Sequence, residues 1–157
     1  MAPIFVSKLP LLNNLNYPLD GYRRLYGKRI LGDHKTWRGL FAGVIVGGIV
    51  GWLEWDLLRE IIGFSYINPL LWGCMLGLGA LVGDGVKSFF KRQLNIKSGQ
   101  TWFPFDQIDY IVGGILFSLP VIIFPWYFYA AILIIYFVLH LLISFVGFLL
   151  KLKDAPI

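Results

Sequence analysis

Long apolar stretches restrict what this chain can fold into more than any other feature of its sequence. The run from Trp126 to Leu150 contains no Asp, Glu, Lys or Arg. A charge-free segment of that length is typical of a helix that crosses a bilayer. The whole chain is 57% hydrophobic and 15% charged, with a mean hydropathy of +0.70, which excludes a free soluble globular domain. The sequence therefore predicts an all-α, multi-pass transmembrane helix bundle.

Apolar length and the positions of Gly and Pro predict four spans, over residues 39–53, 69–90, 110–124 and 126–150. The first and third are short for a hydrocarbon core about 30 Å thick, so we expect local bilayer thinning or extension into their flanks. The apolar N-terminal residues 2–12 are too short and too interrupted by Pro to span. They are interpreted as an interfacial or re-entrant segment, or as the end of a further span. Spans and short polar loops account for all 157 residues, which predicts a single integral-membrane domain over residues 1–157.

Glycines recur at four-residue spacing along the first predicted span, at Gly39, Gly43, Gly47 and Gly51. This spacing gives one helix face without side chains, which favours close helix packing over a substrate groove. The packing partner is either another helix of the bundle or a second copy of the chain in an oligomer.

The basic residues are distributed unevenly. All 14 Lys and Arg except Arg59 lie in residues 8–38, in residues 87–97, or at Lys151 and Lys153. Four spans place these segments on one side, and the positive-inside rule assigns that side to the cytoplasm of a cell-membrane protein. The acidic connection over residues 54–68 then faces outward as a solvated loop. The net charge of +5 is explained by this topology and does not call for a nucleic-acid partner.

The first basic segment, YRRLYGKRILGDHKTWRG over residues 22–39, ends at the start of a predicted helix. Backbone amides at a helix N-terminus, together with Lys35 and Thr36, can bind phosphate. The segment lacks the spacing of a P-loop. Its alternative roles are to determine topology or to attract anionic lipid. His34 in this segment is interpreted as a surface residue, and His140 in the last apolar run as structural.

The second basic segment follows the predicted span 69–90. If the helix continues through Arg92, then Asp84, Ser88 and Lys91 lie within about 60° of one another on one helix face. A carboxylate near the end of a span is costly unless it is paired or bound to metal. The alternative for Asp84 is an internal ion pair with Lys87 or Lys91.

Asp106 and Asp109 are three residues apart at the start of the next predicted span. If they are helical they project together and repel each other, and a divalent cation relieves that repulsion. An all-oxygen ligand set suits a hard metal such as Mg²⁺. Helix capping is an alternative that explains Asp106 but explains Asp109 poorly.

These residues form the pattern Gly83-Asp84-xxx-Ser88-xx-Lys91-Arg92-xxxx-Lys97, followed by Asp106-xx-Asp109. The pattern resembles the membrane cytidylyltransferases that make CDP-activated lipids, including the bacterial CDP-diacylglycerol synthases. The bacterial proteins have His-Gly-Gly before the first of the two later aspartates and Arg after it, whereas here residues 102–105 are Trp-Phe-Pro-Phe and residue 107 is Gln. In these features and in its basic loop, the chain is similar to the archaeal CDP-archaeol synthases, over residues 21–114.

The resemblance implies a fold that usually has five spans and a reaction between CTP and an isoprenoid glycerol-ether phosphate lipid, 2,3-di-O-geranylgeranylglyceryl phosphate. The products are the CDP-lipid and pyrophosphate. Three sets of residues carry over: catalytic Asp84, Ser88, Lys91, Arg92, Asp106 and Asp109; substrate-binding Lys35, Thr36, Arg38, Lys91, Arg92 and Lys97; and Mg²⁺-binding Asp84, Asp106 and Asp109.

Other functions are compatible with parts of the sequence. The same chemistry could act on phosphatidic acid, as in a CDP-diacylglycerol synthase. A CDP-alcohol phosphotransferase requires a denser DGxxAR aspartate array, which the sequence lacks. A transporter could place Asp84 on an ion path, but no inverted repeat is found and the acids gather near one surface. A non-enzymatic anchor leaves the three carboxylates without a role.

Overall fold

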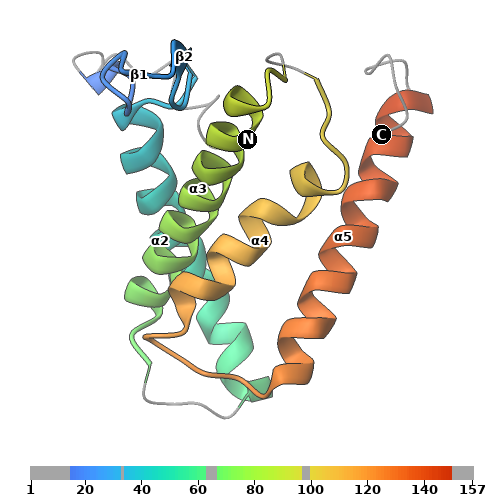
Figure 1. Ribbon diagram of the computed structural model, residues 1–157. Helices are drawn as coiled ribbons and strands as arrows, with labels where there is room; N and C mark the ends of the chain where they lie inside the picture. Colours follow the sequence, from blue (N-terminus) through green and yellow to red (C-terminus); the bar gives the residue numbers. More distant parts are fainter. Residues whose placement is uncertain (1–14, 33, 63–66, 97–99, 150–157) are drawn as a thin grey trace.

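The computed structural model of the protein describes residues 15–32, 34–62, 67–96 and 100–149. In these ranges the chain forms a small hairpin and four helices: β1 (Arg24–Leu25), β2 (Lys28–Arg29), α2 (Trp37–Ile62), α3 (Pro69–Gln93), α4 (Phe105–Ser118) and α5 (Trp126–Leu149). Helix α3 packs between α2 and α4, and α5 flanks α4 on its other side (Figure 1). The prediction of an all-α, multi-pass bundle is confirmed.

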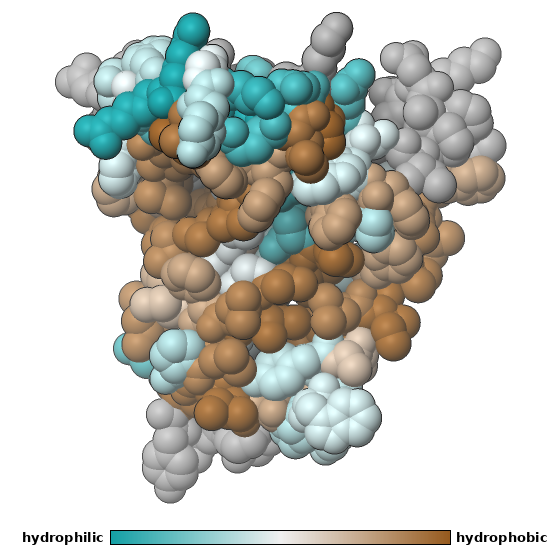
Figure 2. Space-filling model, viewed as in Figure 1, coloured by the Kyte–Doolittle hydropathy of each residue, from teal (hydrophilic) through white to brown (hydrophobic). Residues whose placement is uncertain are grey.

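The bundle has one polar end. The hairpin, the end of α3 and the start of α4 all lie at that end (Figure 1), where Figure 2 shows hydrophilic residues gathered above a hydrophobic band. In the described ranges, the stretches long and apolar enough to cross a membrane are Trp37–Trp55, Pro69–Gln93 and Trp126–Gly147. The two basic segments predicted to share a side do lie together.

Helix α2 is longer than predicted. The sequence predicted a span over residues 39–53 and an acidic loop from residue 54, but the helix continues to Ile62. No Gly or Pro occurs from residue 52 to residue 62, and Leu, Glu and Arg favour helix, so nothing stops the helix where its apolar stretch ends. The predicted extension into the flanks therefore occurs in this span.

Helix α4 is shifted toward the N-terminus from its predicted position. It begins at Phe105 rather than at residue 110 and ends at Ser118 rather than at residue 124. Its 14 residues rise only about 21 Å, less than the thickness of a hydrocarbon core. Pro120 lacks the N–H that a continuing helix needs and restricts the residue before it, so the helix stops there.

Glycines allow α2 and α3 to approach closely. A Cβ atom at Gly47 would lie 2.7 Å from the carbonyl oxygen of Gly73, and one at Gly51 would lie 2.6 Å from the Gly73 Cα. Any side chain at these positions would push the helices apart. The prediction that the glycine stripe serves close packing is confirmed within the bundle.

The basic loop before α2 is folded around Asp20, whose side chain is fully buried. Its carboxylate accepts hydrogen bonds from the backbone N–H groups of Tyr22, Leu31 and Gly32, and from the guanidinium of Arg29. Burial alone would raise the pKa of Asp20, but these bonds outweigh it and lower the pKa to about 2. The loop is fastened to the start of α2, because the N–H of Leu19 donates to the carbonyl oxygen of Lys35 at 2.7 Å.

Candidate functional site

A glycine contact between α3 and α4 sets the position of the site. A Cβ atom at Gly83 would overlap the carbonyl oxygen of Asp109, and Gly79 and Gly113 meet in the same way farther along the two helices. The α4 backbone therefore lies directly against α3 at the residue before Asp84. Because Asp109 and Asp84 adjoin this contact, their side chains are brought together at the polar end of the bundle.

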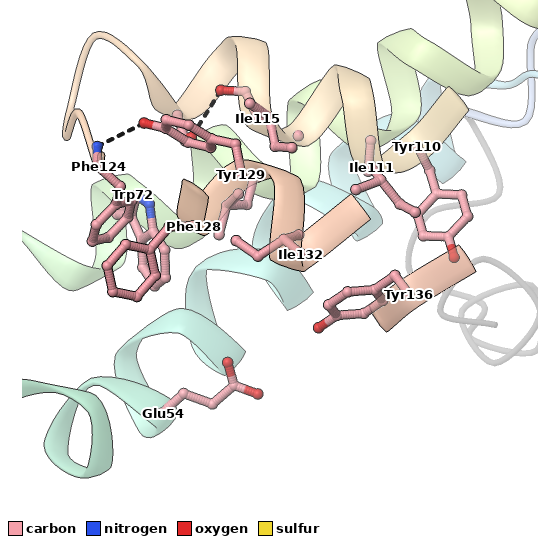
Figure 3. Close-up of a pocket in the computed structure, with 14 residues that line it drawn as sticks. Glu54, Trp72, Tyr110, Ile111, Ile115, Phe124, Phe128, Tyr129, Ile132 and Tyr136 are labelled. Atoms are coloured by element: carbon pink, nitrogen blue, oxygen red, sulfur yellow. Dashed lines mark hydrogen bonds between the residues drawn. The ribbon is translucent and has the colours of Figure 1, made fainter. Parts of the chain in front are cut away.

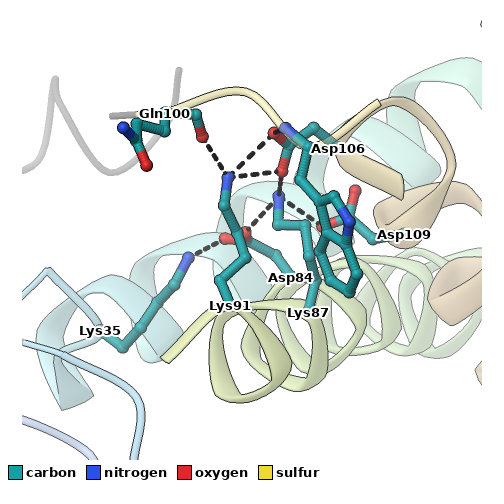
Figure 4. A network of polar contacts seen from close by, with 8 residues as sticks. Lys35, Asp84, Lys87, Lys91, Gln100, Asp106 and Asp109 are labelled. Atoms are coloured by element: carbon teal, nitrogen blue, oxygen red, sulfur yellow. Dashed lines mark hydrogen bonds and ion pairs between the residues drawn. The ribbon is translucent and has the colours of Figure 1, made fainter. Parts of the chain in front are cut away.

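The ammonium group of Lys87 lies among three carboxylates (Figure 4). Its Nζ atom is 3.1 Å from Asp84 Oδ1, 3.1 Å from Asp106 Oδ1 and 2.8 Å from Asp109 Oδ2. The pairing of Asp84 with Lys87 was foreseen as an alternative for that aspartate alone. The convergence of all three aspartates on Lys87 was not foreseen, since it depends on how α4 crosses α3.

Lys91 binds one of these carboxylates from the next turn of α3. Its Nζ donates to both oxygens of Asp106, at 3.0 and 2.9 Å, and to the carbonyl oxygen of Gln100 at 2.6 Å. Asp106 also accepts a hydrogen bond of 2.6 Å from the N–H of Trp102. Asp106 lies in the first turn of α4, whose N-cap residue is Pro104, so it is not the capping residue.

The basic loop contributes Lys35 to the same cluster. The Lys35 ammonium contacts Asp84 Oδ2, which ties the loop before α2 to the end of α3 (Figure 4). Both side chains are partly exposed, at 22% and 33%, so the cluster is open to solvent on this side. The two basic segments, which were predicted to share one side of the membrane, are in direct contact here.

The remaining predicted residues lie around the cluster in different roles. Thr36 accepts a hydrogen bond of 3.2 Å from the N–H of Gly39 and so stabilises the first turn of α2. Arg38 and Ser88 are buried. Arg92 donates to the carbonyl oxygen of Ile96 at 3.0 Å and its side chain lies against Gly32 rather than against the aspartates. Lys97 lies outside the described residues.

The carboxylates suit a hard cation by their chemistry. Three carboxylates surround one position with oxygen atoms, and the buried Oδ1 of Asp109 has no hydrogen-bond partner in the described part of the chain. Within those same residues no group of three acidic, His or Cys side chains is arranged as a finished metal site. Lys87 occupies the central position instead.

An apolar cavity of about 470 Å³ adjoins the cluster. It is lined by α3, α4, α5, the connection between α4 and α5, and one residue of α2, through Glu54, Trp72, Leu76, Ala80, Tyr110, Ile111, Gly114, Ile115, Ser118, Phe124, Phe128, Tyr129, Ile132 and Tyr136 (Figure 3). Tyr110, which follows Asp109 in α4, is the lining residue next to the cluster, and the lining extends to Phe124 in the connection after α4. No sequence motif pointed to these residues, because the apolar residues that line a cavity and those that face lipid cannot be distinguished by sequence within a span.

A multi-pass membrane protein with a cluster of carboxylates and ammonium groups at its polar end, beside an apolar cavity, is suited to handling phosphorylated lipids. Comparison with known proteins identifies the family. The family described as "CarS-like: CDP-archaeol synthase" matches residues 10–157. The chain belongs to the CDP-archaeol synthase family.

Individual relatives agree with this assignment. A CDP-archaeol synthase of Methanoregula boonei is 40% identical over 174 residues, which cover 99% of this chain and 99% of the relative. The CDP-archaeol synthase of Thermococcus gammatolerans is 41% identical over 118 residues, 74% of this chain and 68% of that protein. A solved structure described as an intramembrane enzyme for archaeal membrane lipids biosynthesis has a TM-score of 0.70 and 28% identity, over 90% of this chain and 88% of its own.

Proposed function

We propose that this protein transfers CMP from CTP to an isoprenoid glycerol-ether phosphate lipid, giving a CDP-archaeol-type lipid and pyrophosphate. The observation that carries the proposal is the position of the charged cluster. Three carboxylates and three ammonium groups meet where α3, α4 and the basic loop join, and the lining of an apolar cavity includes Tyr110, the residue after Asp109. Family membership supports the same reaction.

The reaction needs little beyond positioning and charge compensation. A phosphate oxygen of the lipid attacks the α-phosphorus of CTP, a new P–O bond forms, and the bond to the β-phosphate oxygen breaks to release pyrophosphate. The attacking oxygen is already ionised at neutral pH, so no general base is required. The obstacle is repulsion between two anions, which cationic side chains reduce most strongly in the transition state.

The cations of the cluster would bind the phosphate groups. Lys35 reaches the cluster from the loop and Lys91 reaches it from α3, so they approach a ligand from two sides. Ammonium and guanidinium groups form strong hydrogen bonds with phosphate oxygens. Arg38, Arg92 and Lys97 belong to the same two segments and are proposed to hold the outer phosphates, with hydrogen bonds from Thr36 and Ser88.

Asp84, Asp106 and Asp109 would hold a divalent metal ion, for which we propose Mg²⁺. The ion would neutralise the triphosphate and stabilise the leaving pyrophosphate. The protein's part is to present three carboxylates from two helices at one point. That geometry rests on the glycine contact between α3 and α4.

The lipid would bind with its phosphate at the polar end and an isoprenoid chain in the cavity along α4. The cavity wall is aromatic and aliphatic over most of its length, which suits a branched hydrocarbon. The distribution of Lys and Arg supports a cytoplasmic position for the polar end, where CTP is available.

Transfer of radiolabelled CMP from CTP into extractable lipid tests the proposal. The detergent-purified protein is assayed with Mg²⁺ or with EDTA, and with geranylgeranyl ether phosphate or diacyl phosphate as acceptor. The expected result is metal-dependent label in the ether lipid. Label only with the diacyl acceptor, phosphatidic acid, would support the transfer reaction and contradict the proposed ether-lipid substrate. No label with either acceptor, in folded protein, would contradict the proposal.

A further inference from the structure

Lys87 differs from the other lysines of the cluster in what it contacts. The Lys35 ammonium lies on Asp84 and the Lys91 ammonium on Asp106, whereas that of Lys87 lies within 3.1 Å of oxygens from all three aspartates. Its side chain is 16% exposed and lies between the two helices that carry the carboxylates (Figure 4). It therefore occupies the point that a shared cation would occupy.

The charges of the cluster balance with Lys87 in place. Three carboxylates face three ammonium groups, so the cluster is formally neutral. Without Lys87, the carboxylates would repel one another with no cation between them. Asp109 depends on it most, because its side chain is only 7% exposed and its Oδ1 has no hydrogen-bond partner in the described ranges. A buried carboxylate without a counter-charge is strongly unfavourable.

We propose that Lys87 is a positioning residue whose ammonium group stands in for the divalent cation. It keeps the three carboxylates assembled before substrate binds, and it competes with a metal ion that arrives without nucleotide. When the ion arrives with CTP, the phosphate oxygens give the ammonium a new partner, and the carboxylates become available. The inference rests on the proposed function, since it takes the three aspartates as metal ligands.

Metal binding in the absence of nucleotide tests this role without measuring activity. Mn²⁺, which accepts the same oxygen ligands as Mg²⁺, is titrated into the detergent-purified protein and the free ion is followed by electron paramagnetic resonance. We expect weak binding to the wild type and binding at least about tenfold tighter to Lys87→Met, because the competing ammonium is gone. A lysine without contact to the carboxylates would not produce a gain in metal affinity of this size when it is removed.

Two further variants make the result specific. Lys87→Arg keeps the charge and is expected to bind Mn²⁺ as weakly as the wild type. Lys28→Met removes a lysine that donates to the Gln93 carbonyl oxygen at 2.6 Å, away from the aspartates, and is expected to leave Mn²⁺ affinity unchanged. Thermal unfolding supplies a second measurement: Lys87→Met should unfold at a lower temperature than the wild type in EDTA, and Mn²⁺ should reduce the difference.

The outcomes separate the inference from the proposed function. Lys87→Gln is a second neutral variant, measured in the same way. If wild type binds Mn²⁺ with CTP but Lys87→Met and Lys87→Gln bind the metal alone no more tightly than wild type does, the proposed role of Lys87 is wrong and the proposed site stands. If the wild type binds no Mn²⁺ even with CTP, the metal-binding role of the aspartates is wrong and the inference falls with it. Tighter binding in Lys28→Met as well would also overturn it, because the gain would then not be specific to Lys87.

Discussion

The two sides of helix α4 are packed in opposite ways. Against α3 its backbone is in direct contact through Gly79, Gly83 and Gly113, with no room for a side chain at these positions. Against α5 it leaves a cavity of about 470 Å³ walled by large side chains. The tight side fixes charged groups relative to one another, and the open side leaves space for an apolar chain. One side of this short helix therefore positions the groups that bind phosphate, and the other side leaves space for the hydrocarbon chain.

The largest expected effect concerns the charged groups on the tight side. Asp109→Asn and Asp106→Asn should each abolish CMP transfer, because an amide cannot supply the negative charge that a divalent cation requires. The fold should persist, as judged by gel filtration and circular dichroism. His140→Ala, on α5 beside Tyr110, is the control and should retain transfer. Full activity in Asp109→Asn would refute its role as a ligand.

The glycine contact itself is the next test. Gly83→Ala should lower CMP transfer about 100-fold, because the added methyl group would force α4 away from α3 and displace Asp109 from Asp84. Gly85→Ala is a matched control two residues along the same helix, where a Cβ atom meets nothing within 4 Å. Equal activity in the two variants would show that close contact at Gly83 does not position the site.

The open side predicts a smaller and more selective effect. Ile132→Trp fills part of the cavity and should reduce kcat/KM for the long-chain ether lipid about tenfold while leaving the KM for CTP unchanged. Ile134→Trp places the same side chain on an exposed face of α5 and should behave as wild type. A change in the KM for CTP rather than for lipid would argue against the cavity as the chain site.

The smallest effect is expected in the loop that supports Lys35. Asp20→Asn should lower the unfolding temperature at pH 7 by roughly 2–6 °C, because the ionised carboxylate accepts hydrogen bonds from four residues. The pKa of about 2 in the folded protein lies below the ordinary aspartate value of 3.8. The contribution is therefore present above pH 4 and lost as the pH falls through about 2.

Thermal unfolding followed from pH 7 down to pH 2 measures this contribution. The difference between wild type and Asp20→Asn should shrink over the lower part of that range. Glu54→Gln, which removes an exposed carboxylate on α2, is the control. A difference that stays constant down to pH 2 would show that the ionisation of Asp20 is not its source.

Local sequence predicted the elements better than their ends. The apolar runs located all four helices, and the four-residue glycine spacing predicted close packing of α2 but not that α3 is its partner. The end of α2 was missed because apolar length marks where a bilayer ends, whereas helix propensity over residues 54–62 decides where the helix ends. For α4 the run was followed too far, although Pro120 marks the limit.

The site was predictable in its residue types and not in its pairings. The spacings of Asp84, Lys91, Asp106 and Asp109 placed each on a helix face, and the structure brings these four together. The central place of Lys87 depends on the angle and depth at which α4 crosses α3, which no single segment encodes. Arg92 was predicted to belong to the site because it follows Lys91. Its side chain lies against Gly32 instead, and its position in the sequence did not indicate this.

A crystal structure of the protein with CTP and a divalent metal ion would test the central claim most directly. The account predicts that carboxylate oxygens of Asp84, Asp106 and Asp109 surround the metal ion, and that the Lys87 ammonium has moved from between them to a phosphate oxygen. A metal ion held by the nucleotide alone, with Lys87 still between the three carboxylates, would contradict it.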